Sequence, residues 1–255
     1  MRSIGNRAFE NCYSLEKVVF DENSNIESIG DMAFQNCDIL TSITIPAGVT
    51  HVGMLIFGFS MSATVYCEIE SQPEGWDSDW CSSDLMVYKY PVVWDCKNQD
   101  IADDGNIYYV DESRIRYTIK DGEATVAIQA RIDSENIEIP SSIAYKGNVY
   151  SVTSIGMYAF EGCSGFTSIT IPDSVTSIDE WAFYNCSSLK NVYYLGTQQQ
   201  WSQIVIIGGN NSYLLNAKRY YYSESEPSLN EDGTAYDGNY WHYVDGVPTP
   251  WIKEA

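Results

Sequence analysis

The sequence repeats itself, and this internal repeat constrains the fold more than any other feature. A block of ten residues that begins at Ser3 recurs with the same small and apolar residues at the same places. The clear copies are Ser3–Cys12, Ser28–Cys37, Ser154–Cys163 and Ser177–Cys186, and a degraded fifth copy runs through Val52, Gly53, Phe57 and Ser60. Because one unit of this size cannot bury its apolar edge alone, we expect the blocks to stack as a solenoid.

Each block continues into a short run that is typical of a β-strand. Leu40–Pro46, with the sequence LTSITIP, returns as Phe166–Pro172, with the sequence FTSITIP. Alternation along these runs points Ile43 and Ile45 to one face, and the final proline cannot donate to the ladder, so pairing ends there. A turn of helix is expected at about residues 179–184, with Ala182 and Phe183 facing inward.

The repeat unit S-I-G-x-x-A-F-x-x-C-x-x-L-x-x-I-x-I-P closely resembles the BspA-like leucine-rich-repeat family, directly over residues 3–67 and 151–196. This resemblance implies a mainly β solenoid of leucine-rich-repeat arrays with short strands and helical turns, plus β-rich cap and linker segments. It also implies a bacterial protein that is extracellular or at the cell surface. Such a module would bind an extracellular protein partner, from the host or from bacteria, or act in adhesion.

Stacking in register predicts columns of identical side chains. Phe9, Phe34 and Phe57 should lie over one another in a first array, and Phe160 over Phe183 in a second. Cysteines at one fixed repeat position are expected to be small buried residues. A disulfide among the remaining cysteines, Cys67, Cys81 and Cys96, is left open, with free thiols favoured.

The repeats divide the chain into four predicted segments. Residues 1–96 form the first array with a C-terminal cap, and 97–131 form a β-hairpin lead-in or linker. Residues 132–196 form the second array, and 197–255 form a C-terminal cap and β tail. Trp76 and Trp201 are expected to plug the open ends of the two cores. Since the chain starts inside a repeat, we expect an open, N-terminally truncated edge and hence a fragment of a longer protein.

Composition excludes several classes of function. The net charge of −21 opposes binding to nucleic acid or to anionic lipid, which both need Lys and Arg. No stretch approaches the roughly 18–20 apolar residues of a membrane helix, so no membrane insertion is expected. The first 20 residues lack the apolar core of a signal peptide, so an export signal is expected outside this chain.

Catalytic and metal-binding patterns are missing from the sequence. No C-x-x-C pair suggests zinc, and the two histidines, His51 and His242, fall in different arrays. Carboxylates are scattered over predicted turns and exposed strand positions. We therefore predict no catalytic residue, no metal site and no cofactor, and a protein that is not an enzyme.

The outward face of the predicted strands is the candidate binding surface. Alternation assigns it Ser42, Thr44, Thr64 and Tyr66 in the first array and Ser168, Thr170, Asn191 and Tyr193 in the second. Solenoid faces of this kind bind extended partners, although Ser and Thr also simply suit exposed strands. Carbohydrate binding by stacking on exposed cap and tail aromatics is the alternative, through Trp80, Trp94, Trp241 and Trp251.

Overall fold

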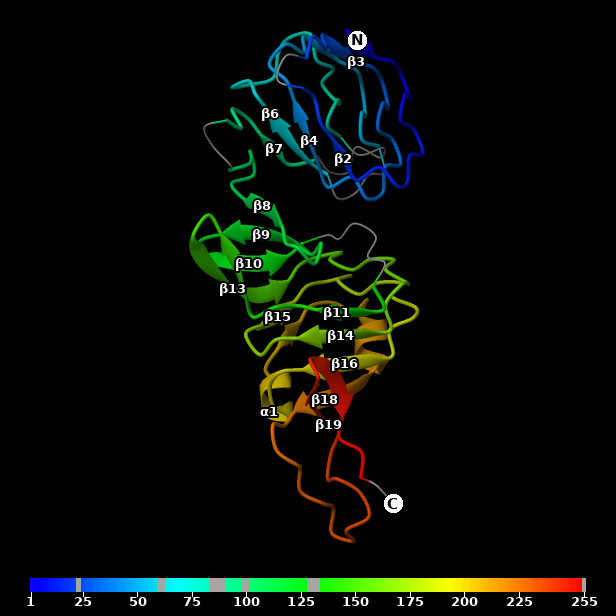
Figure 1. Ribbon diagram of the computed structural model, residues 1–255, viewed down its shortest axis with the longest axis vertical. Coiled ribbons are helices and arrows are strands. Elements are labelled where there is room, and N and C mark those ends of the chain that lie inside the picture. The colour runs from blue at the N-terminus through cyan, green and yellow to red at the C-terminus, as the bar shows by residue number, and fades with distance from the viewer. Residues whose placement is uncertain (22–23, 59–62, 83–89, 98–100, 128–133, 254–255) are drawn as a thin grey trace. The chain divides into compact units, whose positions relative to one another are not determined.

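The computed structural model describes residues 1–21, 24–58, 63–82, 90–97, 101–127 and 134–253 (Figure 1). The chain divides into two compact units. Unit 1 contains Met1–Val110 with Thr118–Lys120 and Gln129–Arg131, and unit 2 contains Asp111–Tyr117, Asp121–Ile128 and Ile132–Ala255. Ser60, in the degraded repeat, and the predicted boundary between residues 131 and 132 lie outside the described residues.

Unit 1 is built from two parallel ladders. The short ladder has the order β1-β3-β5, and the longer one has the order β2-β4-β6-β7. Their bounds are β1 (Ser3–Ile4), β2 (Lys17–Val18), β3 (Ser28–Ile29), β4 (Ser42–Ile45), β5 (His51–Val52), β6 (Thr64–Cys67) and β7 (Val92–Val93); β8 (Ile107–Val110) follows in the chain. Because the strands pair in register, Ile4, Ile29 and Val52 lie on adjacent strands, as the repeat predicts.

Unit 2 repeats this plan. One ladder contains the order β17-β15-β13-β10, and the other has the order β11-β14-β16-β18-β19-β20. The strand β9 (Arg116–Lys120) is divided between the units, since Thr118–Lys120 belong to unit 1. The bounds in unit 2 are β10 (Glu123–Val126), β11 (Asn136–Glu138), β12 (Ser142–Tyr145), β13 (Asn148–Ile155), β14 (Ser168–Ile171), β15 (Ser177–Ile178), β16 (Asn191–Tyr194), β17 (Val205–Ile206), β18 (Lys218–Tyr222), β19 (Tyr240–Val244) and β20 (Val247–Pro250). Between these parallel strands β12 pairs antiparallel with β13, and β19 pairs antiparallel with β20.

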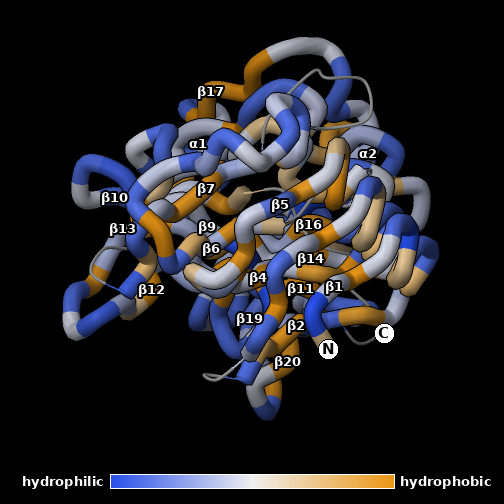
Figure 2. Tube along the Cα trace, turned by 90° about the horizontal axis from the view of Figure 1, so that it is seen from above, coloured by the Kyte–Doolittle hydropathy of each residue, from blue (hydrophilic) through white to orange (hydrophobic). Residues whose placement is uncertain are grey.

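The phenylalanine columns form the centre of each core. The ring centroids of Phe9 and Phe34 are 5.3 Å apart, those of Phe34 and Phe57 are 6.2 Å apart, and those of Phe160 and Phe183 are 5.2 Å apart. All three pairs are stacked, which confirms the predicted columns. Figure 2 shows the short apolar stretches alternating with polar ones along the trace, the pattern that stacked short strands require.

The segment between the two strands of each repeat is a pair of turns. In residues 179–184 the amide of Ala182 donates to the carbonyl of Asp179, and that of Tyr184 donates to the carbonyl of Trp181. Trp181 has a φ of 63° and Asn185 a φ of 58°, which interrupts any helix. In the described part of the chain the helices are α1 (Gln198–Trp201) and α2 (Ser212–Asn216), and neither is long and apolar enough to cross a membrane.

Tryptophans close the C-terminal end of each core, as predicted. Trp76 is buried beyond β5, and its indole donates to the carbonyl of Val49 at 3.2 Å. Trp201 is buried on α1, which Thr197 begins with a capping box. The guanidinium of Arg219 lies over the Trp201 ring, 4.2 Å from its centroid. Arg219 pairs with Val192 on the neighbouring strand, so it takes the position of an apolar residue in the column. Its methylene stem can cover the core while the guanidinium lies at the edge.

Candidate functional site

The predicted sheet-face residues lie side by side on neighbouring strands. The structure aligns Ser42 with Thr64 and Thr44 with Tyr66 in unit 1. In unit 2 it aligns Ser168 with Asn191 and Thr170 with Tyr193. Register therefore assembles two four-residue groups, one in each unit.

In unit 1 only part of this surface is open. Thr44 is exposed and Ser42 is half-buried, but Thr64 is buried. The Tyr66 hydroxyl donates to the carbonyl of Tyr108 at 3.4 Å, so the later chain contacts the outward face of β6. The predicted exposure of Thr64 is therefore wrong, because a segment from outside the repeats lies over its strand.

In unit 2 the same surface is largely covered. Ser168, Thr170 and Tyr193 are buried, so their predicted exposure is wrong, and Asn191 is half-buried. The cover is the tail: the ring of fully buried Trp241 lies 5.3 Å from that of Tyr193. Figure 1 shows the red tail hairpin crossing the strands β16 and β18.

Hydrogen bonds fix this tail hairpin on the sheet. The indole of Trp241 donates to the carbonyl of Tyr194 at 2.9 Å, and the hydroxyl of Tyr243 donates to Glu138 at 2.8 Å. Burial, together with this bond to a carboxylate, raises the pKa of Tyr243 and keeps its hydroxyl a donor. The face of unit 2 is therefore occupied by residues of its own chain.

The turns of the repeats form a second surface, which we call the turn face. It comprises residues 5–12, 30–37 and 53–58 in unit 1 and residues 156–163 and 179–186 in unit 2. The fifth residue of every block has a positive φ, although none is glycine: 55° at Arg7, 53° at Met32, 50° at Leu55, 58° at Tyr158 and 63° at Trp181. This left-handed conformation costs roughly 1–2 kcal/mol for such residues.

Hydrogen bonds between repeats accompany this strained backbone. The amide of Arg7 donates to the carbonyl of Asp31, and the amide of Phe9 donates to that of Ala33, both at 2.8 Å. In unit 2 the amide of Phe160 donates to the carbonyl of Ala182 at 2.7 Å. Alternate amides of the turn thus point to the next repeat. The side chains of Arg7, Met32, Tyr158 and Trp181 at the fifth position are exposed or half-buried, whereas Leu55 there and Gln35 at the eighth position are buried.

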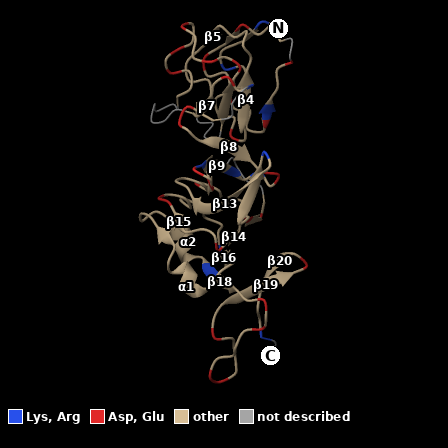
Figure 3. Ribbon diagram, turned by 90° about the vertical axis from the view of Figure 1, so that its left-hand side faces the viewer, with Lys and Arg blue, Asp and Glu red and all other residues tan. Residues whose placement is uncertain are grey.

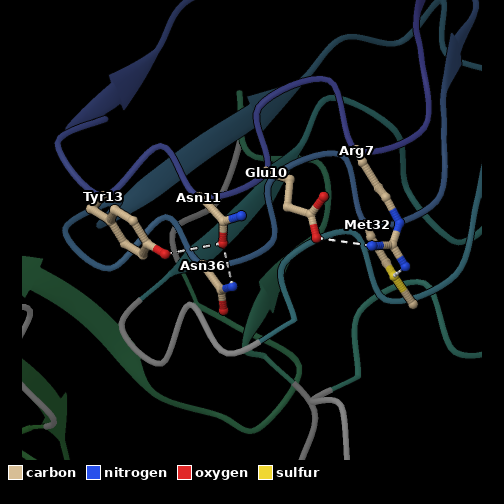
Figure 4. Close-up of polar contacts among 6 residues, drawn as sticks. All are labelled: Arg7, Glu10, Asn11, Tyr13, Met32 and Asn36. Atoms are coloured by element: carbon tan, nitrogen blue, oxygen red, sulfur yellow. Dashed lines mark hydrogen bonds and ion pairs between the residues drawn. The ribbon is translucent and has the colours of Figure 1, made fainter.

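In the first two repeats of unit 1 the turn face carries polar side chains that bond to one another (Figure 4). The guanidinium of Arg7 donates to Glu10 at 2.9 Å and to the sulfur of Met32 at 3.2 Å. The amide of Asn36 donates to Asn11 at 2.7 Å, linking the two repeats. These side chains satisfy one another.

In unit 2 the turn face is aromatic. The rings of Tyr158 and Trp181 are 6.1 Å apart, and those of Trp181 and Tyr184 are 4.8 Å apart and edge to face. Tyr184 is 42% exposed, and the other two rings are half-buried. Sequence reasoning missed these three residues, which we call the aromatic cluster. The available signal was the variable composition of the fifth and eighth positions within otherwise constant blocks.

The repeated cysteine has a structural use. The thiol of Cys186 donates to the carbonyl of Phe160 at 3.1 Å, and that of Cys37 donates to the carbonyl of Phe9 at 3.3 Å. Burial raises the pKa of Cys37 to about 11 and also raises the pKa of Cys186, so both stay protonated donors. All seven cysteines are free thiols, which answers the open question about Cys67, Cys81 and Cys96.

Groups suited to chemistry are dispersed in the described ranges. Among those residues no three His, Cys, Asp or Glu side chains come together in a way that could hold a metal ion. His51 is on β5, and its ring shares a hydrogen bond with the hydroxyl of Thr50 at 2.9 Å. The ring of His242 stacks on that of Trp251, with the ring centroids 3.9 Å apart.

The stacked strands, the phenylalanine columns and the turn face define a leucine-rich-repeat solenoid. The family described as "BspA type Leucine rich repeat region" matches in six copies, over residues 1–74 and 131–204, which is more than half of the chain. The protein belongs to the BspA-type leucine-rich-repeat family. Comparison with curated proteins gives no match.

Several solved structures are similar to this chain. A leucine-rich repeat protein from Bacteroides capillosus ATCC 29799 is 35% identical over 33% of this chain and 69% of that one, with a TM-score of 0.31. A leucine rich cell surface protein from Faecalibacterium prausnitzii A2-165 is 19% identical over 81% of this chain and 80% of that one, with a TM-score of 0.26. A leucine-rich repeat protein from Eubacterium ventriosum ATCC 27560 is 19% identical over 89% and 66%, with a TM-score of 0.31. The family assignment rests on the repeat match.

Proposed function

We propose that this chain is a non-catalytic module that binds a protein partner at the bacterial surface or outside the cell, in adhesion. The observation that carries the proposal is the contrast between inward and outward positions of the repeat. Inward positions keep the same residues in both units, whereas the fifth position of the turn face changes from Arg7 and Met32 to Tyr158 and Trp181. Solenoids bind partners through such outward side chains on a constant backbone.

Membership of the BspA-type family supports a binding role, and the location outside the cell is what the family resemblance implies. The charge agrees with a protein partner, since 35 acidic against 14 basic residues disfavour nucleic acid and anionic membranes. The red segments of the ribbon in Figure 3 mark Asp and Glu positions on turns and loops of both units. No cofactor is part of this proposal.

A pull-down with the whole chain tests the function. The immobilised chain is exposed to a panel of extracellular-matrix and mucosal proteins, and retained proteins are identified by mass spectrometry. A double variant, Ser42→Arg with Thr44→Arg, blocks the open part of the sheet face in unit 1, and Thr50→Arg with Ala47→Arg is the control of equal charge. Retention of nothing above background would contradict the proposed function. Loss with the sheet-face variant alone would assign the partner to that sheet.

Carbohydrate binding through the cap and tail aromatics has less support. Trp80 and Trp241 are buried, so neither ring is available for stacking on a sugar. Trp94 and Trp251 are half-buried, and Trp251 already stacks on His242 and donates to the carbonyl of Ser223. A glycan array probed with the whole chain decides this alternative, since a signal lost with Trp94→Ala would favour it.

A further inference from the structure

The aromatic cluster is the apolar part of a surface whose ionisable groups are all acidic. Residues 156–163 and 179–186 contain Glu161, Asp179 and Glu180 and no Lys or Arg. Glu161 occupies the same repeat position as Tyr184, one layer away, and its side chain is exposed. A cation arriving here would meet aromatic rings and negative charge together.

Two residues of the aromatic cluster, Tyr158 and Trp181, have an unfavourable backbone conformation with positive φ. The ninth residues of the same repeats, Gly162 and Asn185, also have positive φ, and both types tolerate that conformation. At the fifth position the chain instead keeps Tyr158 and Trp181, which are bulky and disfavoured there. Because Arg7, Met32 and Leu55 share this conformation, the strain belongs to the repeat backbone, which fixes where the two rings lie.

The next layer of the stack packs backbone, without a side chain, against the acidic edge of the turn face. Gly208 lies against Glu180, so closely that a Cβ there would fall 2.7 Å from the Glu180 Cγ atom. The following Gly209 is exposed and has open space where a side chain would begin. The glycines therefore bring no side chain toward the acidic edge of the turn face.

We propose that the Tyr158–Trp181–Tyr184 cluster, flanked by Glu161 and Glu180, receives an Arg or Lys side chain from a basic segment of a protein partner. This inference rests on the proposed protein-binding function and names the chemistry of the partner. A cation over the face of Trp or Tyr gains cation–π energy, and Trp is the best acceptor. The net charge of −21 draws a basic segment toward the chain, and the cluster gives the contact its position.

The test uses a fluorescein-labelled peptide, Gly-Ser-Arg-Ser-Arg-Ser-Arg-Gly, and the same peptide with citrulline in place of arginine. Anisotropy titrations compare the whole chain with Trp181→Asn, which changes no charge and suits the positive φ. Met32→Asn is the matched control, since it makes the same kind of change at the same backbone position in unit 1. We expect Trp181→Asn to weaken binding of the arginine peptide about tenfold, and Met32→Asn to change it less than twofold. The citrulline peptide should bind at least tenfold more weakly than the arginine peptide.

Other outcomes overturn the inference. Equal binding by the two Asn variants would show that the peptide responds only to the overall charge of the chain. Binding of neutral oligosaccharides that Trp181→Asn abolishes, with no effect on the arginine peptide, would assign the cluster to glycans. A urea unfolding curve confirms that Trp181→Asn is folded. If the pull-down retains a partner equally well with wild type and Trp181→Asn, protein binding stands and this assignment of the cluster fails.

Discussion

The turn faces of the two units share one backbone and carry different side chains. The φ angle is 53° at Met32 and 58° at Tyr158, and the phenylalanine columns behind them have ring spacings of 5.3 and 5.2 Å. Outside this common frame, unit 1 has an Arg7–Glu10 ion pair and unit 2 has Trp181 packed edge to face on Tyr184. Packing therefore fixes the inward residues, whereas the outward ones differ between the units.

The greatest loss of stability is expected from variants in the phenylalanine columns that both units share. Phe34→Ala and Phe183→Ala should each lower the free energy of unfolding by about 3–5 kcal/mol, because both rings are fully buried within a column. Urea unfolding gives the size of the loss, and hydrogen exchange assigns it to one unit. Phe9→Ala is the control, since Phe9 is 38% exposed at the end of its column and should cost much less. Equal costs at Phe9 and Phe34 would contradict the stacked-layer account.

The next largest loss of stability is expected where the hydrogen bonds between successive turns end in unit 2. In unit 2 the side chain of Asn211 accepts from the amide of Phe183 at 3.0 Å and donates to the carbonyl of Asp179 at 2.9 Å. Asn211→Leu leaves both backbone groups without these bonds and should cost about 2–4 kcal/mol. Differential scanning calorimetry measures the loss, with Asn210→Leu as the neighbouring control. A stability equal to that of wild type would show that Asn211 does not close the ladder.

A smaller effect compares internal with terminal repeats. Cys186→Ala removes a buried thiol and its bond to the carbonyl of Phe160, so we expect a loss of about 1–2 kcal/mol. Cys12 holds the same repeat position but is exposed in the first layer, and Cys12→Ala should change stability by less than about 0.5 kcal/mol. Chemical denaturation of both variants checks the difference. A large loss of stability in Cys12→Ala would show that exposure in the first layer does not reduce the contribution of the repeated cysteine.

The smallest effect tests the strained fifth position. Arg7→Asn should stabilise the chain by about 0.5–1 kcal/mol, because relief of the positive φ exceeds the value of an exposed ion pair. Trp181→Asn should leave stability nearly unchanged, since the same relief is offset by lost ring contacts with Tyr158 and Tyr184. Thermal unfolding of the pair measures both. A gain at Trp181 as large as at Arg7 would mean that the aromatic cluster contributes no packing energy.

The sequence alone predicted the phenylalanine columns, but it did not predict which surfaces are exposed. Repeated phenylalanines predict stacking, since equal positions in successive layers become neighbours. The positive φ at Met32 and Trp181 could not be predicted, because neither residue favours that conformation and interrepeat hydrogen bonds impose it. The burial of Thr170 and Tyr193 was missed because Trp241 and Tyr243 come from a tail outside the repeats. Periodicity within a repeat carries no information about such a cover.

In unit 2 one amide side chain makes the hydrogen bonds that the backbone of a further layer would make. Asn211 presents an oxygen to Phe183 and a nitrogen to Asp179, where the backbone of another turn would otherwise bond. The position of this residue therefore indicates where further repeats could be inserted by protein engineering. Extra repeat modules grafted between Leu195 and the Asn211 segment would lengthen the array, and the original end piece would still terminate it.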